Sequence, residues 1–154
     1  MQAPDHLELR RAADRGLRVL VVEDHPINRQ ILALMLERIP AHVTLAENGQ
    51  EGVEAYQRQT FDVVLMDLRM PLMDGYEAMR RIRAIEAETG ADHTPIIVIS
   101  AHTRASDLDQ ARAAGADHHL GKPVHIPTLL GTMDEVLRRR GETMAPVARH
   151  ATGA

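Results

Sequence analysis

The sequence predicts an α/β fold, in which a doubly wound sheet of five parallel strands is flanked by five helices. Short apolar runs alternate with longer segments of helical period over most of the 154 residues, as in a series of βα units. Three of the runs are apolar throughout, which is typical of strands buried on both faces. Aromatic residues make up only 2% of the chain while 44% of it is hydrophobic, so the core must be mainly aliphatic.

The strands are predicted from the apolar runs in chain order. The fully apolar runs lie at 19–22, 63–66 and 96–99, and we expect them in the centre of the sheet. The other two runs are shorter or interrupted by polar residues. The expected strands cover 18–22, 42–46, 62–66, 95–99 and 116–120.

The helices are predicted from apolar periodicity and from residues suited to helix ends. Pro26 fits the first turn of the first helix, and Asn48 is a good N-cap for the second. Gly90, Gly115 and Gly141 are expected to end the third, fourth and fifth helices. The expected helices cover 26–39, 49–59, 75–89, 103–114 and 126–140.

The two ends of the chain are expected to lie outside this domain. Residues 1–16 are rich in charge and contain a helix-compatible stretch at 7–15, so they predict a linker or a short leading helix. Residues 141–154 are small and polar, contain a proline and show no periodicity, which predicts a disordered tail. The domain itself is therefore expected to cover 17–140.

Composition argues against several classes of protein. The net charge is −4 and basic residues are mixed with acidic ones, so the sequence shows no basic patch that would bind nucleic acid. No apolar run approaches the roughly 18 residues of a membrane span, and no signal-peptide core is present. Cysteine is absent and the nine histidines are dispersed, so neither disulfides nor a transition-metal site is expected. These features favour a cytoplasmic, soluble protein.

Chemically reactive side chains follow the predicted strands. Glu23 and Asp24 follow the first strand, Asp67 the third, Ser100 the fourth, and Lys122 comes soon after the fifth. Open parallel sheets bind ligands outside the carboxyl ends of their strands, so we expect these groups to converge. Three adjacent carboxylates repel one another unless a cation lies among them, and Mg²⁺ prefers such oxygen ligands. Lysine and hydroxyl groups opposite the metal would hold phosphoryl oxygens.

Asp67 is the best candidate for a nucleophile because it ends the central strand. Attack by its carboxylate on phosphorus would form an acyl phosphate, with the metal and Lys122 neutralising charge during in-line transfer.

Four segments carry a resemblance to a known family: VLVVEDHPINRQ, DVVLMDLRMPLMDG, PIIVISA and GADHHLGKP. In this order they resemble the receiver domains of bacterial response regulators, most closely those of hybrid sensor histidine kinases, and cover about 18–137. The resemblance implies a flavodoxin-like sheet with strand order 2-1-3-4-5. It also implies that Asp67 is the phosphoacceptor and that Glu23, Asp24, Asp67 and the backbone carbonyl of Arg69 bind Mg²⁺, with Mn²⁺ as a substitute.

The same resemblance implies a conformational switch. Ser100 would move to bond the phosphoryl group, Lys122 would pair with that group, and the Lys122–Pro123 peptide would be cis. His119 occupies the switch position where the family usually has an aromatic residue, which suggests a pH-sensitive switch as a hypothesis. Arg69 and His102 are expected to tune the lifetime of the acyl phosphate.

The function implied is phosphorelay signalling without enzymatic turnover of a separate substrate. A sensor histidine kinase or a histidine phosphotransfer protein would dock on 26–39 and donate the phosphoryl group. The signal would leave through about 103–140 to a downstream protein, and the resemblance allows a phosphorylation-dependent dimer. Because the chain begins with Met1, a stand-alone regulator is slightly favoured over a hybrid-kinase receiver.

Two other functions remain open from the sequence. A degenerate receiver would bind protein or nucleotide without being phosphorylated, although the full set of site residues argues against it. A phosphohydrolase resembling the haloacid dehalogenases would also use a strand-end aspartate and Mg²⁺. Such an enzyme normally has a second carboxylate two residues after the nucleophile, where this chain has Arg69.

Overall fold

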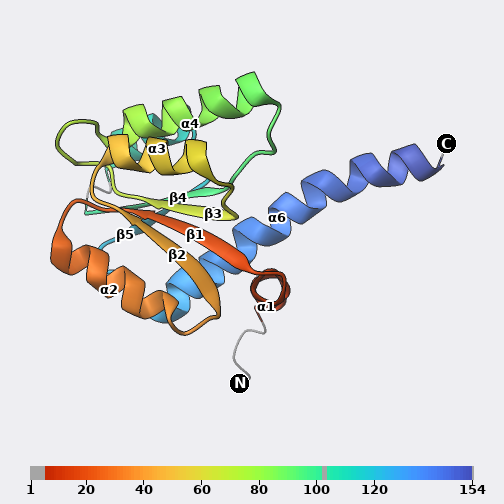
Figure 1. Ribbon diagram of the computed structural model, residues 1–154, viewed down its shortest axis with the longest axis horizontal. Coiled ribbons are helices and arrows are strands. Elements are labelled where there is room, and N and C mark those ends of the chain that lie inside the picture. Colours follow the sequence, from red (N-terminus) through yellow and green to blue (C-terminus); the bar gives the residue numbers. More distant parts are fainter. Residues whose placement is uncertain (1–5, 102–103, 154) are drawn as a thin grey trace.

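A computed structural model describes residues 6–101 and 104–153, with the backbone alone described for 142–153. Within these residues eleven elements follow one another, and helices and strands alternate throughout (Figure 1). Their bounds are α1 Leu7–Asp14, β1 Leu17–Val22, α2 Pro26–Leu36, β2 Ala41–Ala46, α3 Gly49–Arg58, β3 Val63–Met66, α4 Gly75–Thr89, β4 Ile96–Ser100, α5 Ala105–Ala114, β5 His118–Gly121 and α6 Ile126–Gly153.

The five strands form one parallel sheet in the order β2-β1-β3-β4-β5, which confirms the predicted strand order. The three runs expected to be central are β1, β3 and β4. Every residue of β3 and β4 is buried, as the fully apolar sequences predict. The outer strands β2 and β5 are only partly buried, which explains their interrupted apolar patterns.

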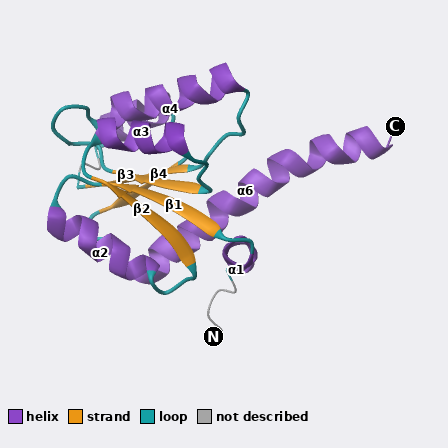
Figure 2. Cartoon of the chain, viewed as in Figure 1, coloured by secondary structure: helices purple, strands orange, loops and turns teal. Residues whose placement is uncertain are grey.

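Helices cover both faces of the sheet (Figure 2). Buried side chains of α3, α4 and α5 pack with Leu20, Val64 and Val98 on one face. Buried side chains of α1, α2 and α6 pack with Val19, Leu65 and other strand residues on the opposite face. The two cores differ because successive residues of a strand point to opposite faces of the sheet.

Most of the predicted helix ends are confirmed. Pro26 lies in the first turn of α2, and the Asn48 side chain caps α3 by accepting a hydrogen bond from the Glu51 amide at 2.8 Å. Gly90 and Gly115 follow α4 and α5 with φ values of 72° and 124°, which side chains with a Cβ rarely adopt. The first predicted helix ends earlier than expected, at Leu36 instead of residue 39.

The start of the chain forms a helix that belongs to the domain. Leu9 and Ala12 of α1 are buried against the α2 and α6 side of the sheet. The Leu9 amide donates a hydrogen bond to Asp134 Oδ1 on α6 at 3.0 Å. Residues 7–14 therefore form a short helix that packs on the core of the domain predicted for 17–140.

The predicted end of the last helix at Gly141 is wrong. Helix α6 continues through Gly141 to Gly153 and extends away from the sheet (Figure 1), in place of the disordered tail expected for 141–154. A glycine inside a helix costs about 1 kcal/mol relative to alanine, which weakens a helix without ending it. In the part of the chain that the structure describes, no helix is both long and apolar enough to span a lipid bilayer.

Candidate functional site

Three carboxylates meet at the carboxyl ends of β1 and β3. One oxygen from each of Glu23, Asp24 and Asp67 lies within 4.8 Å of the other two. Glu23 and Asp67 are buried, while Asp24 is half-buried. The structure thus brings together the three acids that the sequence singled out, and it leaves one of them accessible to solvent.

Strand register accounts for this convergence. Val22 lies opposite Met66 in the parallel pairing of β1 with β3, so the residues that follow both strands emerge side by side. The Asp67 amide donates to the Val22 carbonyl at 3.0 Å, and the Glu23 amide donates to the Ala46 carbonyl at 3.1 Å. These backbone bonds extend the sheet by one residue and fix both acids at its edge.

Gly75 allows α4 to approach the backbone of Asp67. A Cβ at position 75 would lie 2.1 Å from the Asp67 carbonyl oxygen and 2.9 Å from the Leu68 Cα. The Gly75 amide donates to the Leu68 carbonyl at 2.9 Å, while the Leu68 amide donates to Asp67 Oδ1 at 2.9 Å. Gly75, which the sequence analysis did not assign to the site, therefore helps to position the backbone that carries the Asp67 carboxylate.

Lys122 lies beside two of the three acids. Its Nζ donates a hydrogen bond to Glu23 Oε1 at 2.8 Å and lies 3.6 Å from Asp67 Oδ1. The Lys122–Pro123 peptide is cis, which confirms that expectation. The sequence predicted that Lys122 would reach the site, but its contact with Glu23 depends on side-chain geometry that no strand pattern specifies.

The electrostatics of the site follow from burial and close charges. Burial, followed by the negative charge of Glu23, raises the pKa of Asp67 to about 7. Burial also acts to raise the pKa of Glu23, but hydrogen bonds from Lys122 and the His25 amide outweigh it and leave that pKa lowered. For Lys122, burial lowers the pKa, while the bond to Glu23 and both negative charges produce a net rise.

These residues fit a small divalent cation. Three carboxylates supply hard oxygen ligands within reach of one another, and Lys122 is the cation that contacts two of them. The half-buried Asp24 leaves one side of the group toward solvent, as a metal that keeps several waters requires.

The remaining predicted residues are placed as follows. Ser100 is fully buried at the end of β4, opposite Gly121 of β5, and its carbonyl accepts a hydrogen bond from the Lys122 amide at 3.1 Å. His119 is half-buried in β5, opposite Val98. Their switch roles remain predictions, and His102 lies outside the described residues.

An apolar pocket adjoins the site. It has a volume of about 320 Å³ and opens between α2 and the segment after β5. Beside it, Ile27, Ile31 and Leu34 expose 65%, 43% and 54% of their surface along α2. The pocket is lined by Glu23, Asn28, Ile31, Leu32, Met35, Ile99, Lys122, Pro123 and Val124.

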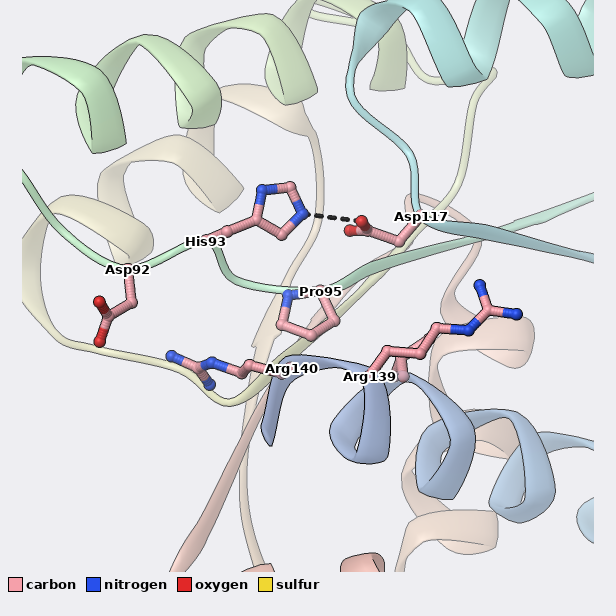
Figure 3. A pocket seen from close by; sticks show the side chains of 7 residues that line it. Asp92, His93, Pro95, Asp117, Arg139 and Arg140 are labelled. Atoms are coloured by element: carbon pink, nitrogen blue, oxygen red, sulfur yellow. Dashed lines mark hydrogen bonds and ion pairs between the residues drawn. The ribbon is translucent and has the colours of Figure 1, made fainter. Parts of the chain in front are cut away.

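A second pocket of about 280 Å³ lies at the opposite ends of the strands, near the starts of β4 and β5 (Figure 3). His93 Nε2 and Asp117 Oδ1 pair across it at 2.7 Å, while Arg140 lies 3.7 Å from Asp62. His93 and Asp117 thus pair with each other, and the pocket does not adjoin the three carboxylates.

Comparison with protein families and curated proteins gives consistent matches. A model described as "Response regulator receiver domain" matches residues 19–134. The chain is 40% identical over 112 residues to the sensor protein GacS of Pseudomonas syringae pv. syringae, covering 73% of this chain and 12% of that protein. It is 36% identical over 142 residues to the virulence sensor protein BvgS of Bordetella pertussis, covering 90% and 11%. The chain thus spans only a small part of these relatives.

Solved structures show the same similarity. The receiver domain of sensor histidine kinase PA1611 from Pseudomonas aeruginosa, with a magnesium ion in its active-site cleft, matches with 33% identity and a TM-score of 0.71. That match covers 79% of this chain and 98% of the other. The receiver domain of Ssk1, crystallised with the histidine phosphotransfer protein Ypd1 of Saccharomyces cerevisiae, matches with 31% identity and a TM-score of 0.74, covering 78% and 88%.

Proposed function

The chain belongs to the family of response regulator receiver domains, which act in phosphorelay signalling, and we propose that Asp67 is its phosphoacceptor. The observation that carries the assignment is the group formed by Asp67, Glu23, Asp24 and Lys122 at one edge of the sheet. Asp67 directly follows a fully buried strand, and contacts with the Leu68 amide and Lys122 hold its carboxylate.

Phosphoryl transfer requires Asp67 in its ionised form. A carboxylate oxygen attacks the phosphorus, the bond from phosphorus to a phosphohistidine nitrogen breaks, and the electron pair of that bond leaves with the imidazole. Lys122 must then turn from Glu23 toward the new phosphoryl oxygens, whose charge it neutralises. Ser100, buried beside Lys122 at the end of β4, would donate its hydroxyl to the same group.

Glu23, Asp24, Asp67 and the backbone carbonyl of Arg69 are the proposed ligands of Mg²⁺, for which Mn²⁺ can substitute. A metal bound by these residues would supply positive charge to offset the developing charge on phosphoryl oxygens. The magnesium ion in the PA1611 receiver supports this assignment for a related structure. In this chain the closely placed acids and the raised pKa of Asp67 support it.

We propose that the phosphodonor protein binds the apolar surface beside the site. Ile27, Ile31 and Leu34 form an exposed stripe at helical spacing on α2, and the adjoining pocket reaches Glu23 and Lys122. A helical donor, either a histidine phosphotransfer protein or the histidine-bearing part of a sensor kinase, could bury this stripe. The Ypd1–Ssk1 complex supports a donor of this class.

We propose that a downstream protein binds the surface of α5, β5 and α6, within residues 103–140, and that the signal leaves the chain through this contact. A phosphorylation-dependent dimer through the same surface is compatible with this role. In either case Ser100 and His119 link the site to this surface, because they lie on β4 and β5.

The decisive experiment is intact-mass measurement of phosphoryl incorporation from acetyl phosphate, with and without Mg²⁺. We expect one magnesium-dependent phosphoryl group in the unsubstituted chain and none in Asp67→Asn. Asp92→Asn, an exposed acid far from the site, serves as the matched control and should behave like the unsubstituted chain. Absence of incorporation in the unsubstituted chain would instead favour a receiver that binds partners without phosphorylation.

A further inference from the structure

An ion pair joins the loop that follows Asp67 to the first turn of α5. Arg69 Nη2 lies 3.9 Å from Asp107 Oδ1. The Arg69 side chain is 62% exposed, whereas that of Asp107 is only 14% exposed. Since Arg69 comes two residues after Asp67, one end of the pair is tied to the proposed phosphoacceptor and the other to a helix of the proposed output surface.

Tyr76, at the start of α4, adjoins the same pair. Burial raises the pKa of its hydroxyl, the charge of Asp107 raises it further, and the charge of Arg69 opposes the rise. Among the described residues, the buried Tyr76 hydroxyl has no hydrogen-bond partner. Such a group is uncommon in folded proteins, where most buried polar atoms are hydrogen-bonded.

The strength of the pair suits a reversible contact. The 3.9 Å separation is long for an ion pair and Arg69 is largely exposed to solvent, so we expect the pair to contribute little to folding stability. A phosphoryl group on Asp67 would offer the guanidinium several charged oxygens arranged for paired hydrogen bonds. Such a group, two residues away in sequence, competes well with a single carboxylate oxygen at 3.9 Å.

We propose that Asp107 is a positioning residue, which holds the Arg69 guanidinium toward α5 until a phosphoryl group on Asp67 competes for it. The pair would thereby make the lifetime of the acyl phosphate depend on α5, and the position of α5 depend on phosphorylation. This inference rests on the proposed function of Asp67.

A simpler role for Asp107 must be distinguished from this one. An acid in the first turn of α5 interacts favourably with the helix dipole wherever its side chain points. That role would not require Arg69. The two roles therefore differ in whether the effect of replacing Asp107 depends on the residue at position 69.

The test is the half-life of the phosphorylated chain after acetyl phosphate is removed, measured at constant Mg²⁺. We expect Asp107→Asn to lengthen the half-life two- to fivefold, or about 0.4 to 1 kcal/mol in activation free energy, because Arg69 then stays with the phosphoryl group and hinders water. Asp107→Glu should restore a half-life near that of the unsubstituted chain. Asp109→Asn, an exposed acid on the same helix, should leave the half-life unchanged.

The decisive comparison uses Arg69→Ala as the background. There, adding Asp107→Asn should not alter the half-life. An equal change with and without Arg69, or no change in either background, would overturn the proposal while leaving phosphorylation of Asp67 intact. Failure of the unsubstituted chain to take up any phosphoryl group would remove the proposed function itself, and this role of Asp107 with it.

Discussion

The fold strongly alters the acid–base behaviour of Asp67. Its ordinary pKa of 3.8 rises to about 7, first through burial and then through the charge of Glu23. Between these two values the folded chain holds a proton that the unfolded chain has lost. The free energy of unfolding must therefore fall as the pH rises through this window, with the full loss reached above pH 7.

Asp67→Asn removes this titration, so in metal-free buffer we expect it to stabilise the chain more at pH 8 than at pH 4.5. One pKa unit corresponds to about 1.4 kcal/mol, and the gain at pH 8 should exceed that at pH 4.5 by at least about 1 kcal/mol. Denaturant unfolding with a chelator present measures both values. A gain that is the same at both pH values would show that Asp67 is ionised at pH 4.5 in the folded chain.

Gly75 is a second residue whose identity the geometry restricts. Gly75→Ala would place a methyl group 2.1 Å from the Asp67 carbonyl, so it should destabilise the chain by about 2 kcal/mol or more and slow phosphorylation. Gly141→Ala is the matched control, because no atom lies within 4 Å of its added Cβ. That change should stabilise α6 by about 1 kcal/mol. Equal effects of the two substitutions on denaturant unfolding would contradict the close approach of α4.

The sequence predicted well those strands and helices whose position follows from the local pattern of apolar residues. Strands β1, β3 and β4 carry uninterrupted apolar runs, and their ends bring Glu23 and Asp67 together through register alone. The contact between Glu23 and Lys122 joins residues 99 positions apart and depends on side-chain orientation, which periodicity does not encode. The role of Gly75 was missed for a similar reason, because a turn residue and a close-contact residue have the same local sequence.

The two terminal helices show the limit of local pattern. Helix α1 has only eight residues, which are too few for a stable isolated helix, so its state depends on packing against distant α6. Helix α6 continues past Gly141 although glycine commonly follows a helix. In both segments the sequence is compatible with a helix and with an irregular chain, and only the tertiary structure shows which of the two forms.

Docking of α1 predicts a clear stability effect. Leu9 is 1% exposed, so Leu9→Ala should lower the free energy of unfolding by about 2 to 4 kcal/mol through lost burial and a cavity. Leu7→Ala, in the same turn but 46% exposed, should change it by less than about 1 kcal/mol. The comparison is made by chemical denaturation. If the two variants were equally stable, α1 would not be part of the cooperative domain.

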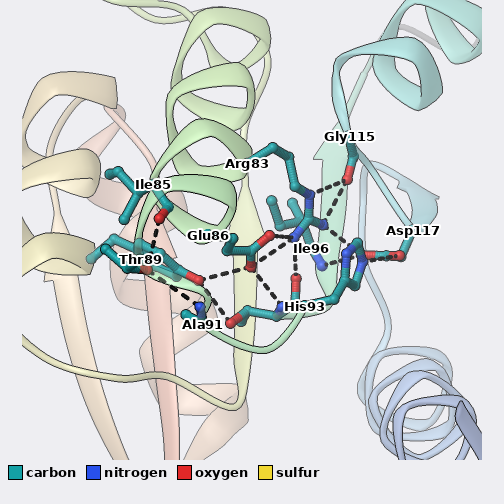
Figure 4. A network of polar contacts seen from close by, with 11 residues as sticks. Arg83, Ile85, Glu86, Thr89, Ala91, His93, Ile96, Gly115 and Asp117 are labelled. Carbon is teal, nitrogen blue, oxygen red and sulfur yellow. Dashed lines mark hydrogen bonds and ion pairs between the residues drawn. The ribbon is translucent and has the colours of Figure 1, made fainter. Parts of the chain in front are cut away.

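Across the whole molecule, Arg83 connects elements at the strand ends opposite the acids (Figure 4). Its guanidinium donates to Glu86 and to the Thr94 carbonyl at 2.8 Å each, to the Gly115 carbonyl at 2.7 Å and to Asp117 at 2.8 Å. The contacts join α4 to the starts of β4 and β5. Glu86 is buried, and Arg83 is the cation that pairs with it.

Replacing Arg83 should therefore affect the entire fold. Arg83→Ala leaves the buried Glu86 without its cation, and we expect a loss of about 3 kcal/mol in unfolding free energy. Arg80→Ala, on the exposed side of the same helix, should cost less than about 1 kcal/mol. Thermal and denaturant unfolding measure both losses. A loss for Arg83→Ala as small as that for Arg80→Ala would contradict this role of the Arg83 ion pair in the fold.

The length of helix α6 can convert a small rotation at its start into a large displacement at its end. It begins at Ile126, four positions after Lys122, and its far part extends beyond the sheet (Figure 1). At 1.5 Å per residue its 28 residues span about 42 Å, so a tilt of about 10° at the near end moves the far end by roughly 7 Å. A small turn of the backbone around Lys122 would thus become a displacement large enough to engage or release whatever the far end touches.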